Sequence, residues 1–185
     1  MNKFKNILLP PLVLFIICVV ITSVLAVTNA ATKDKIAELE AKTQAEAMTR
    51  LLPADRFEEK SGELDGKSFT YYTALQNGKV AGYVFITAGR GYGGSVSVMT
   101  AVGKDGAILS MEVLSASDET PGLGANALKA DWWNQFAGKS GELAVSKDGG
   151  EVDALTGATI TSRAVVSAVN AALDYFDALE VGGNG

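Results

Sequence analysis

The segment DALTGATITS, residues 153–162, gathers hydroxyl and carboxyl side chains around two residues of minimal bulk, Gly157 and Ala158. Five of its residues belong to types that favour helix N-caps: Asp153, Thr156, Thr159, Thr161 and Ser162. We expect a hydroxyl of the last three to cap the helix that follows. A helix start also attracts anions, and the small residues leave room beside Thr159. Two interpretations therefore stay open, plain capping and a threonine that binds or carries an anionic group.

The composition excludes several other chemistries. The chain of 185 residues has no histidine, and its single cysteine lies in an apolar stretch near the N-terminus. These absences remove the commonest zinc, haem and acid–base triad chemistries, so we expect no metal site and no residue that is catalytic by itself. After residue 30 the chain carries 14 basic and 21 acidic side chains, a net charge of −7. Nucleic acid is therefore not an expected partner.

Residues 7–27 form an uncharged apolar stretch, long enough to cross a hydrocarbon core, which needs about 20 residues. Lys3 and Lys5 precede it, and the positive-inside rule then places the N-terminus in the cytoplasm. A cleaved signal peptide is the alternative, but the apolar stretch exceeds the roughly 7–15 residues typical of such peptides. We expect residues 1–30 to form a single-pass helix in the cell (inner) membrane, in contact with lipid. The rest of the chain would be periplasmic or extracellular.

The remaining chain shows first a helical and then a strand pattern. Helix formers continue to Pro53, and we expect a helical stalk over residues 31–60 rather than a partner-binding helix. Alternation with period two then predicts four antiparallel strands, in hairpins over residues 69–88 and 95–116. A helix from about Leu123 to residue 136, a short strand at 143–145 and a helix over 162–179 complete the prediction. Residues 61–185 are thus expected to form an α+β domain, an antiparallel sheet packed with helices.

Three segments resemble one known family. DALTGAT, residues 153–159, resembles the flavinylation signature Asp-x-x-(Ser/Thr)-Gly-Ala-Thr of FMN-binding domains in RnfG of the Rnf complex and in NqrC of the sodium-pumping NADH:quinone reductase. GYGGSVSVM at 91–99 and ETPGLG at 119–124 resemble a glycine-rich turn and a loop of the same family. The modest length and the sequence TGATITSRAVV favour the Rnf protein.

The resemblance implies that FMN is the cofactor and that it is covalent. The last threonine of the signature carries FMN through a phosphoester, and here that residue is Thr159. The signature positions are Asp153, Thr156, Gly157, Ala158 and Thr159. The further expected cofactor contacts are Glu119, Thr120, Leu123, Thr156, Gly157 and Ala158. The structural alternative for 119–124 is a Pro-Gly turn followed by a helix cap. Gly91, Tyr92, Gly93 and Gly94 would cover one side of the flavin or simply join two hairpins.

The resemblance also implies partners and a role. The chain would relay electrons within an Rnf complex, beside the components RnfA, RnfB, RnfC, RnfD and RnfE, and this complex couples electron transfer between ferredoxin and NAD⁺ to ion translocation. A flavin transferase would load the FMN and would use Asp153 in recognising the loop. One alternative is NqrC of the sodium-pumping reductase. Another is a membrane-tethered binding module without flavin, whose threonine loop only caps a helix.

Overall fold

The computed structural model describes the backbone of residues 2–182 and the side chains of residues 9–179. Lys3 and Lys5, on which the predicted orientation rests, lie outside the described side chains. The chain divides into two units between Gln44 and Ala45, and the last turns of the first helix belong to the second unit.

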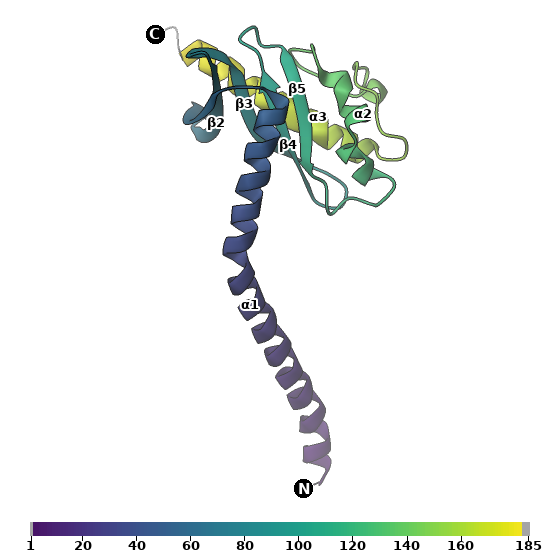
Figure 1. Ribbon diagram of the computed structural model, residues 1–185. Coiled ribbons are helices and arrows are strands. Elements are labelled where there is room, and N and C mark those ends of the chain that lie inside the picture. The colour runs from purple at the N-terminus through teal and green to yellow at the C-terminus, as the bar shows by residue number, and fades with distance from the viewer. Residues whose placement is uncertain (1, 183–185) are drawn as a thin grey trace. The chain divides into compact units, whose positions relative to one another are not determined.

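The first element is one helix, α1 (Asn2–Leu51) (Figure 1). It is long and apolar enough to cross a membrane, and from residue 9 to residue 43 all its side chains are exposed. The helical stalk predicted over 31–60 is too long, because α1 ends at Leu51 and a strand begins at Arg56. Pro53 cannot donate a helical hydrogen bond, and the Ser110 hydroxyl donates to the Leu51 carbonyl at 2.6 Å.

Five antiparallel strands follow in simple order, β1 (Arg56–Leu64), β2 (Lys67–Gln76), β3 (Lys79–Arg90), β4 (Ser95–Val102) and β5 (Ile108–Ser115). The two predicted hairpins are present, and Asn77 and Gly78 form the predicted turn with φ of 50° and 73°. The prediction of four strands missed β1. Its sequence RFEEKSGEL contains five charged residues and no β-branched residue, so it lacks the usual signal of a strand.

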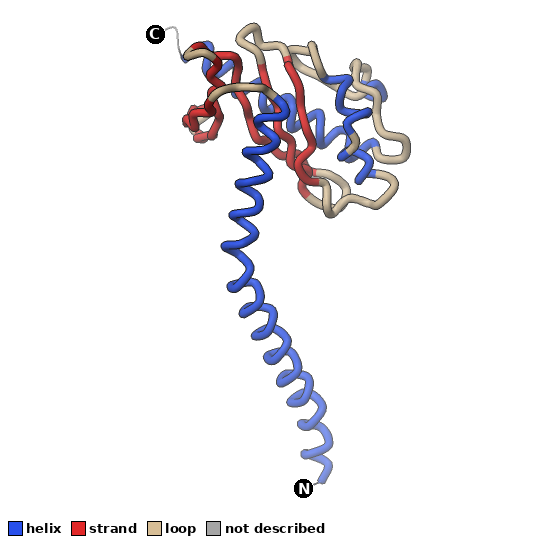
Figure 2. The backbone as a smooth tube through the Cα atoms, in the orientation of Figure 1, coloured by secondary structure: helices blue, strands red, loops and turns tan. Residues whose placement is uncertain are grey.

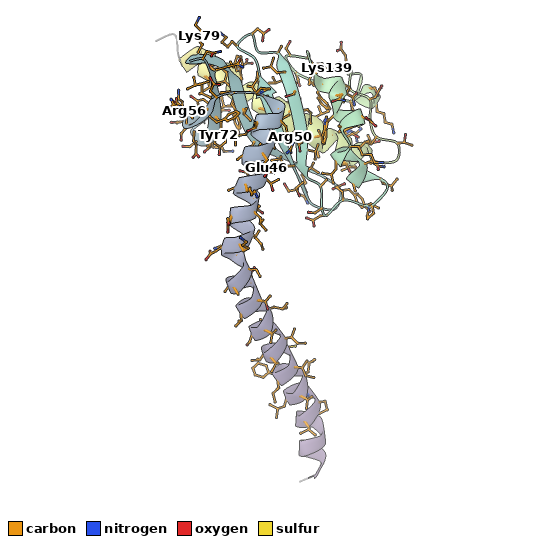
Figure 3. The ribbon with its side chains drawn as sticks, in the orientation of Figure 1. Glu46, Arg50, Arg56, Tyr72, Lys79 and Lys139 are labelled. Carbon is orange, nitrogen blue, oxygen red and sulfur yellow. The ribbon has the colours of Figure 1, made fainter. Side chains whose placement is uncertain are left out.

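The two faces of the sheet are covered differently. The final helix, α3 (Thr159–Gly182), crosses behind the sheet in Figure 1. Its predicted apolar face is confirmed, since five side chains are buried: Val165, Val166, Val169, Leu173 and Phe176. On the opposite face Met48 and Leu52 pack with Val84 and Met99. Arg50, labelled in Figure 3, adds an ion pair to Glu112 of β5 at 2.8 Å. The predicted α+β class is therefore confirmed.

The segment between β5 and α3 is mostly loop, as Figure 2 shows. In place of the single helix predicted to residue 136 it holds η1 (Gly124–Leu128), α2 (Ala130–Trp133) and η2 (Asn134–Phe136), followed by η3 (Ser146–Asp148). The strand predicted at 143–145 is also wrong, because Val145 makes only an isolated parallel bridge to Val152. Gly141 and Gly149, with φ of 70° and 87°, turn the chain on either side before a ladder can extend.

Candidate functional site

The sheet topology brings the three motif segments to one end of the domain. The turn 91–94 joins β3 to β4, and β5 returns antiparallel to β4 with Ser115 opposite Ser97. The loop 117–124 therefore leaves β5 beside that turn. Within this loop Pro121 and Gly122 form the corners of a turn closed by a 3.1 Å bond from the Leu123 amide to the Thr120 carbonyl. The Pro-Gly turn of the structural alternative is thus present, but the helix cap is not, because the N-cap residue of η1, Leu123, has no side-chain cap bond. The turn lies next to the start of α3.

Glu119 joins all three segments. The residue is 4% exposed, and its carboxylate accepts a hydrogen bond from the Gly93 amide at 2.9 Å and another from the Thr161 hydroxyl. Burial raises the pKa of Glu119, but the bonds from Thr161 and from the amides of residues 92–94 outweigh burial, so the pKa lies below its ordinary value. The ionised carboxylate therefore holds the glycine turn and the first turn of α3 together.

Glycines make this close packing possible. A Cβ on Gly124 would lie 2.4 Å from Oε2 of Glu119 and 2.6 Å from Oγ1 of Thr161. A Cβ on Gly93 would lie 1.7 Å from the carbonyl oxygen of Asp118. The backbone carbonyl leaves no room for a side chain at Gly93, and a side chain at Gly124 would have to displace Glu119 and Thr161. The close approach of the two loops therefore requires glycine at these two positions.

The start of α3 differs from the capping prediction. Leu155–Ala158 is a turn with Gly157 at φ 75°, and the Ala158 carbonyl accepts the first helical bond, from Ser162, at 3.0 Å. Ala158 thus occupies the N-cap position, where it offers no side-chain acceptor. The Ser162 hydroxyl instead accepts from the Leu155 amide at 2.9 Å and donates to the Ala158 carbonyl. The hydroxyls of this segment therefore leave the first amides of α3 uncapped.

Thr159 is the first residue of α3, and its hydroxyl has a cationic partner. The Lys147 ammonium in η3 donates a hydrogen bond to Oγ1 of Thr159 at 2.9 Å. Lys147 was not among the residues predicted from the sequence, because the turn-rich segment 138–151 contains no pattern that points to a residue twelve positions later. The positive charge of Lys147 therefore lies beside the hydroxyl of Thr159, the residue that the resemblance predicts to carry FMN.

A pocket of about 370 Å³ opens beside Thr159, within the range of roughly 300–1,000 Å³ common for ligand sites. The segments 119–124 and 157–161 supply most of its lining, and Tyr92 completes it. Its apolar side chains are accessible, with Tyr92 72%, Ile160 49% and Leu123 44% exposed. Of the predicted cofactor contacts, Glu119, Thr120, Leu123, Gly157 and Ala158 line the pocket, whereas Thr156 lies exposed on the adjoining turn.

A larger hollow of about 570 Å³ lies between residues 141–148 and α3. Its lining carries four carboxylates and one guanidinium: Glu142, Asp148, Asp174, Asp177 and Arg163. This excess of negative charge disfavours an anionic ligand, so we take the smaller pocket beside Thr159 as the candidate site.

Asp153 lies outside this pocket, and its backbone is held firmly. Its amide donates to Oε1 of Gln135 at 2.7 Å, and its carbonyl accepts from the Trp132 indole at 2.7 Å and from Nε2 of Gln135 at 3.2 Å. The residue is exposed. The loop before the signature is therefore fixed through the backbone of Asp153, while its carboxylate stays accessible.

Family models match both parts of the chain. The FMN-binding domain matches residues 91–174, and the RnfG N-terminal region matches residues 1–51. The matched region 91–174 includes the whole candidate site, and the matched region 1–51 coincides with α1. The fold and the site therefore define a membrane-associated protein with an FMN-binding domain.

Similar proteins narrow this class. The chain is 38% identical to the G component of the Na⁺-translocating ferredoxin:NAD⁺ oxidoreductase complex of Acetobacterium woodii, over 91% of this chain and 90% of the relative. It is 36% identical to the G component of the ion-translocating oxidoreductase complex of Escherichia coli K12, over 85% of each. A proton-translocating counterpart from Clostridium ljungdahlii is 34% identical, over 87% of this chain and 86% of the relative. The chain belongs to the family of these G components, the RnfG family.

Two solved structures share the fold. The C component of the Na⁺-translocating NADH-quinone reductase from Parabacteroides distasonis matches with a TM-score of 0.57 and 22% identity, covering 80% of this chain and 92% of that one. NqrC from Shewanella oneidensis matches with a TM-score of 0.52 and 21% identity, covering 71% and 73%. At these identities the likeness concerns the fold alone.

The residues present fit FMN, which has an anionic phosphate at one end and a flat aromatic ring at the other. The cation of Lys147 and the uncapped start of α3 suit the phosphate end. The accessible side chains of Tyr92, Leu123 and Ile160 suit an aromatic ring. A Cβ on Gly157 would lie 3.1 Å from Leu123, so a glycine keeps this side of the pocket open.

Proposed function

We propose that this chain is the electron-transferring component of a membrane-bound, Rnf-type, ion-translocating complex, with FMN attached to Thr159 through a phosphoester. The observation that carries the proposal is the environment of Thr159. In the fully described segment 153–162 it is the one hydroxyl that both lines the pocket with partial exposure and contacts a cation. Thr161 is 1% exposed and bonded to Glu119, and Thr156 faces solvent.

The names of the relatives support the wider role. Those from Acetobacterium woodii and Clostridium ljungdahlii belong to ferredoxin:NAD⁺ oxidoreductase complexes, one translocating Na⁺ and one protons. We propose that this chain likewise works with RnfA, RnfB, RnfC, RnfD and RnfE between ferredoxin and NAD⁺. Bound FMN supplies the redox chemistry, and the chain positions it. The chain alone is not expected to turn over NADH, because the sequence predicts no residue that is catalytic by itself.

The proposed orientation of the domain outside the cytoplasm explains why the flavin would be attached covalently. Lys3 and Lys5 precede the apolar helix, which favours a cytoplasmic N-terminus and a domain outside the cytoplasm. A flavin lost by dissociation there would not be replaced from a cytoplasmic supply. A phosphoester to Thr159 prevents this loss, and its negative charge lies at the positive end of α3.

Two other functions were open on sequence grounds. The matches to the RnfG family cover most of the chain at 32–38% identity, against 21–22% for the two quinone reductase proteins, which favours the Rnf assignment. A binding module without flavin is disfavoured by the match of residues 91–174 to the FMN-binding domain and by the uncapped helix start beside a cation.

The test is flavin loading of the full chain when it is coexpressed with a flavin transferase. After denaturing electrophoresis the wild-type band should fluoresce, because only a covalent flavin stays with the chain. Thr159→Ala keeps the small loop but removes the oxygen, so it should give a folded and colourless protein. Mass spectrometry should place the FMN mass on the peptide that contains residues 153–163.

Thr161→Ala is the matched control and should stay yellow, since its hydroxyl is turned to Glu119. It should lose about 1–3 kcal/mol of stability, more than the loss of a cap, because a buried carboxylate loses a donor. FMN mass on residues 153–163 of Thr159→Ala, or its absence from wild type made with an active transferase, would falsify the attachment site.

A further inference from the structure

We propose that Lys147 is a catalytic residue for flavin attachment. Its ammonium stabilises the negative charge that develops on Oγ1 of Thr159 and on the phosphoryl group during transfer, and it then stays paired with the phosphodiester. This inference rests on the proposed attachment at Thr159. The contact that carries it is the 2.9 Å hydrogen bond from Nζ of Lys147 to Oγ1 of Thr159.

Among the described residues, Lys147 is the cation that contacts the hydroxyl of Thr159. The pocket lining contains no lysine or arginine of its own among the described residues. Arg163 lies one turn into α3, but its guanidinium is engaged in two bonds with the Asp148 carboxylate, at 2.7 and 2.6 Å. Asp148 therefore neutralises Arg163 and leaves Lys147 as the positive charge at Thr159.

The loop that carries Lys147 is built to hold it in place. The Ser146 amide donates to the Val152 carbonyl at 2.7 Å, and the Val152 amide donates to the Ala144 carbonyl at 3.1 Å. Gly150 packs so closely that a Cβ would lie 2.0 Å from the Ala144 carbonyl oxygen. These contacts hold residues 144–146 against residues 150–152, so the two ends of the loop that carries Lys147 are fixed to each other.

Asp148, the residue after Lys147, ties the same loop to the first turn of α3 through Arg163. Two neighbouring residues of one loop thus reach two residues of one helix turn, Lys147 to Thr159 and Asp148 to Arg163. Asp148 and Arg163 are positioning residues, because they act on the reacting oxygen through the placement of Lys147.

The transfer of the flavin-bearing phosphoryl group to Thr159 forms one P–O bond, breaks another and involves no redox change. Oγ1 of Thr159 attacks the flavin-bearing phosphorus of a flavin adenine dinucleotide, and an O–P bond forms. The pyrophosphate P–O bond breaks, and adenosine monophosphate leaves with the electron pair. The hydroxyl proton passes to a base of the transferase, because the Lys147 ammonium donates to Oγ1 and cannot accept a proton there. Lys147 acts electrostatically, on charge that moves from the threonine oxygen to the phosphoryl oxygens.

The experiment measures the rate of attachment. Full-length apo protein in detergent is mixed with purified flavin transferase and flavin adenine dinucleotide, and covalent flavin is followed by fluorescence after denaturing electrophoresis. Lys147→Gln should slow attachment about 10- to 100-fold, as expected for losing a hydrogen bond from a charged donor. Lys147→Arg should recover most of the rate, because a guanidinium also donates and stays charged. Lys104→Gln, an exposed lysine in the β4–β5 turn, should react like wild type.

The outcomes separate this inference from the proposed function. If wild type acquires no flavin on Thr159, the proposed function fails. If wild type is loaded and Lys147→Gln is loaded at the same rate, the role of Lys147 is refuted. Equal slowing of Lys147→Gln and Lys147→Arg, together with a lowered melting temperature in both, would also refute it, since the lysine would then act only on the fold.

Discussion

Replacement of Glu119 by glutamine tests whether an ionised carboxylate holds the site together. Glu119 accepts hydrogen bonds from the Gly93 amide and the Thr161 hydroxyl, and it is 4% exposed, so solvent screening is small. Bonds to a charged group contribute about 1.5–3 kcal/mol each, against about 0.5–1.5 kcal/mol for neutral pairs. Glutamine keeps the shape, retains one acceptor oxygen and loses the charge. We therefore expect Glu119→Gln to lower the free energy of unfolding by about 2 kcal/mol at neutral pH.

The pH dependence of this difference has a definite sign. The pKa of Glu119 lies below its ordinary value of 4.5 in the folded protein, so the folded state favours the ionised form. The stabilisation by Glu119 is complete above the unfolded pKa and is lost as pH falls through the folded pKa. The difference between wild type and Glu119→Gln should therefore stay constant from pH 7 to about pH 5 and shrink below pH 4.5.

The assay is urea denaturation of residues 45–185, the unit that contains the whole sheet, followed by fluorescence of Trp132 and Trp133. A shift of the midpoint at constant slope reports stability. Glu142→Gln, at an exposed carboxylate, is the control and should change stability by less than about 0.5 kcal/mol. A difference for Glu119→Gln that is as small as the control, or that persists unchanged at about pH 3, would show that no ionised carboxylate bridges the loops.

Two further predictions concern orientation and loading. Protease added to intact spheroplasts should digest the domain after residue 30, because the two lysines before the apolar helix favour its export; protection of that domain would contradict the orientation. Asp153→Ala should fold but carry little flavin in coexpression with the transferase, since the backbone of Asp153 is held by Trp132 and Gln135 while its carboxylate is exposed. Complete loading, measured by the ratio of flavin to protein, would make Asp153 an ordinary turn residue.

The fold could be predicted where local signals agree with the tertiary structure. Asn77-Gly78 between alternating strands and the apolar stripe of α3 were correctly interpreted from the sequence. The Asp65-Gly66 turn has the same geometry, with φ of 51° and 72°. It was missed because β1 lacks the β-branched residues that indicate a strand in a sequence. This edge strand is stabilised by its pairing with β2 rather than by its own composition.

The site was predictable in its segments but not in its contacts. Glu119, Leu123 and Thr159 do converge on one pocket. The pairing of Glu119 with Thr161 spans 42 positions, and that of Lys147 with Thr159 spans 12, across turns that carry no periodic signal. Such contacts depend on how antiparallel strands return to the same end of the sheet, which spacing along the chain does not encode.

The hydroxyls of TGATITS show what the fold adds to residue type. As residue types, all are equivalent candidates for capping, yet their surroundings differ: Thr156 is exposed on the turn, Thr159 contacts Lys147, Thr161 contacts Glu119, and Ser162 bonds to the turn before the helix. The N-cap itself is Ala158, a residue that costs about 0.5–2 kcal/mol relative to serine or aspartate in that position. A hydroxyl or carboxylate there would occupy the amides that an anion needs, and a carboxylate would also repel a phosphate. The unfavourable cap is therefore understandable as a local cost of keeping the helix start open beside Thr159.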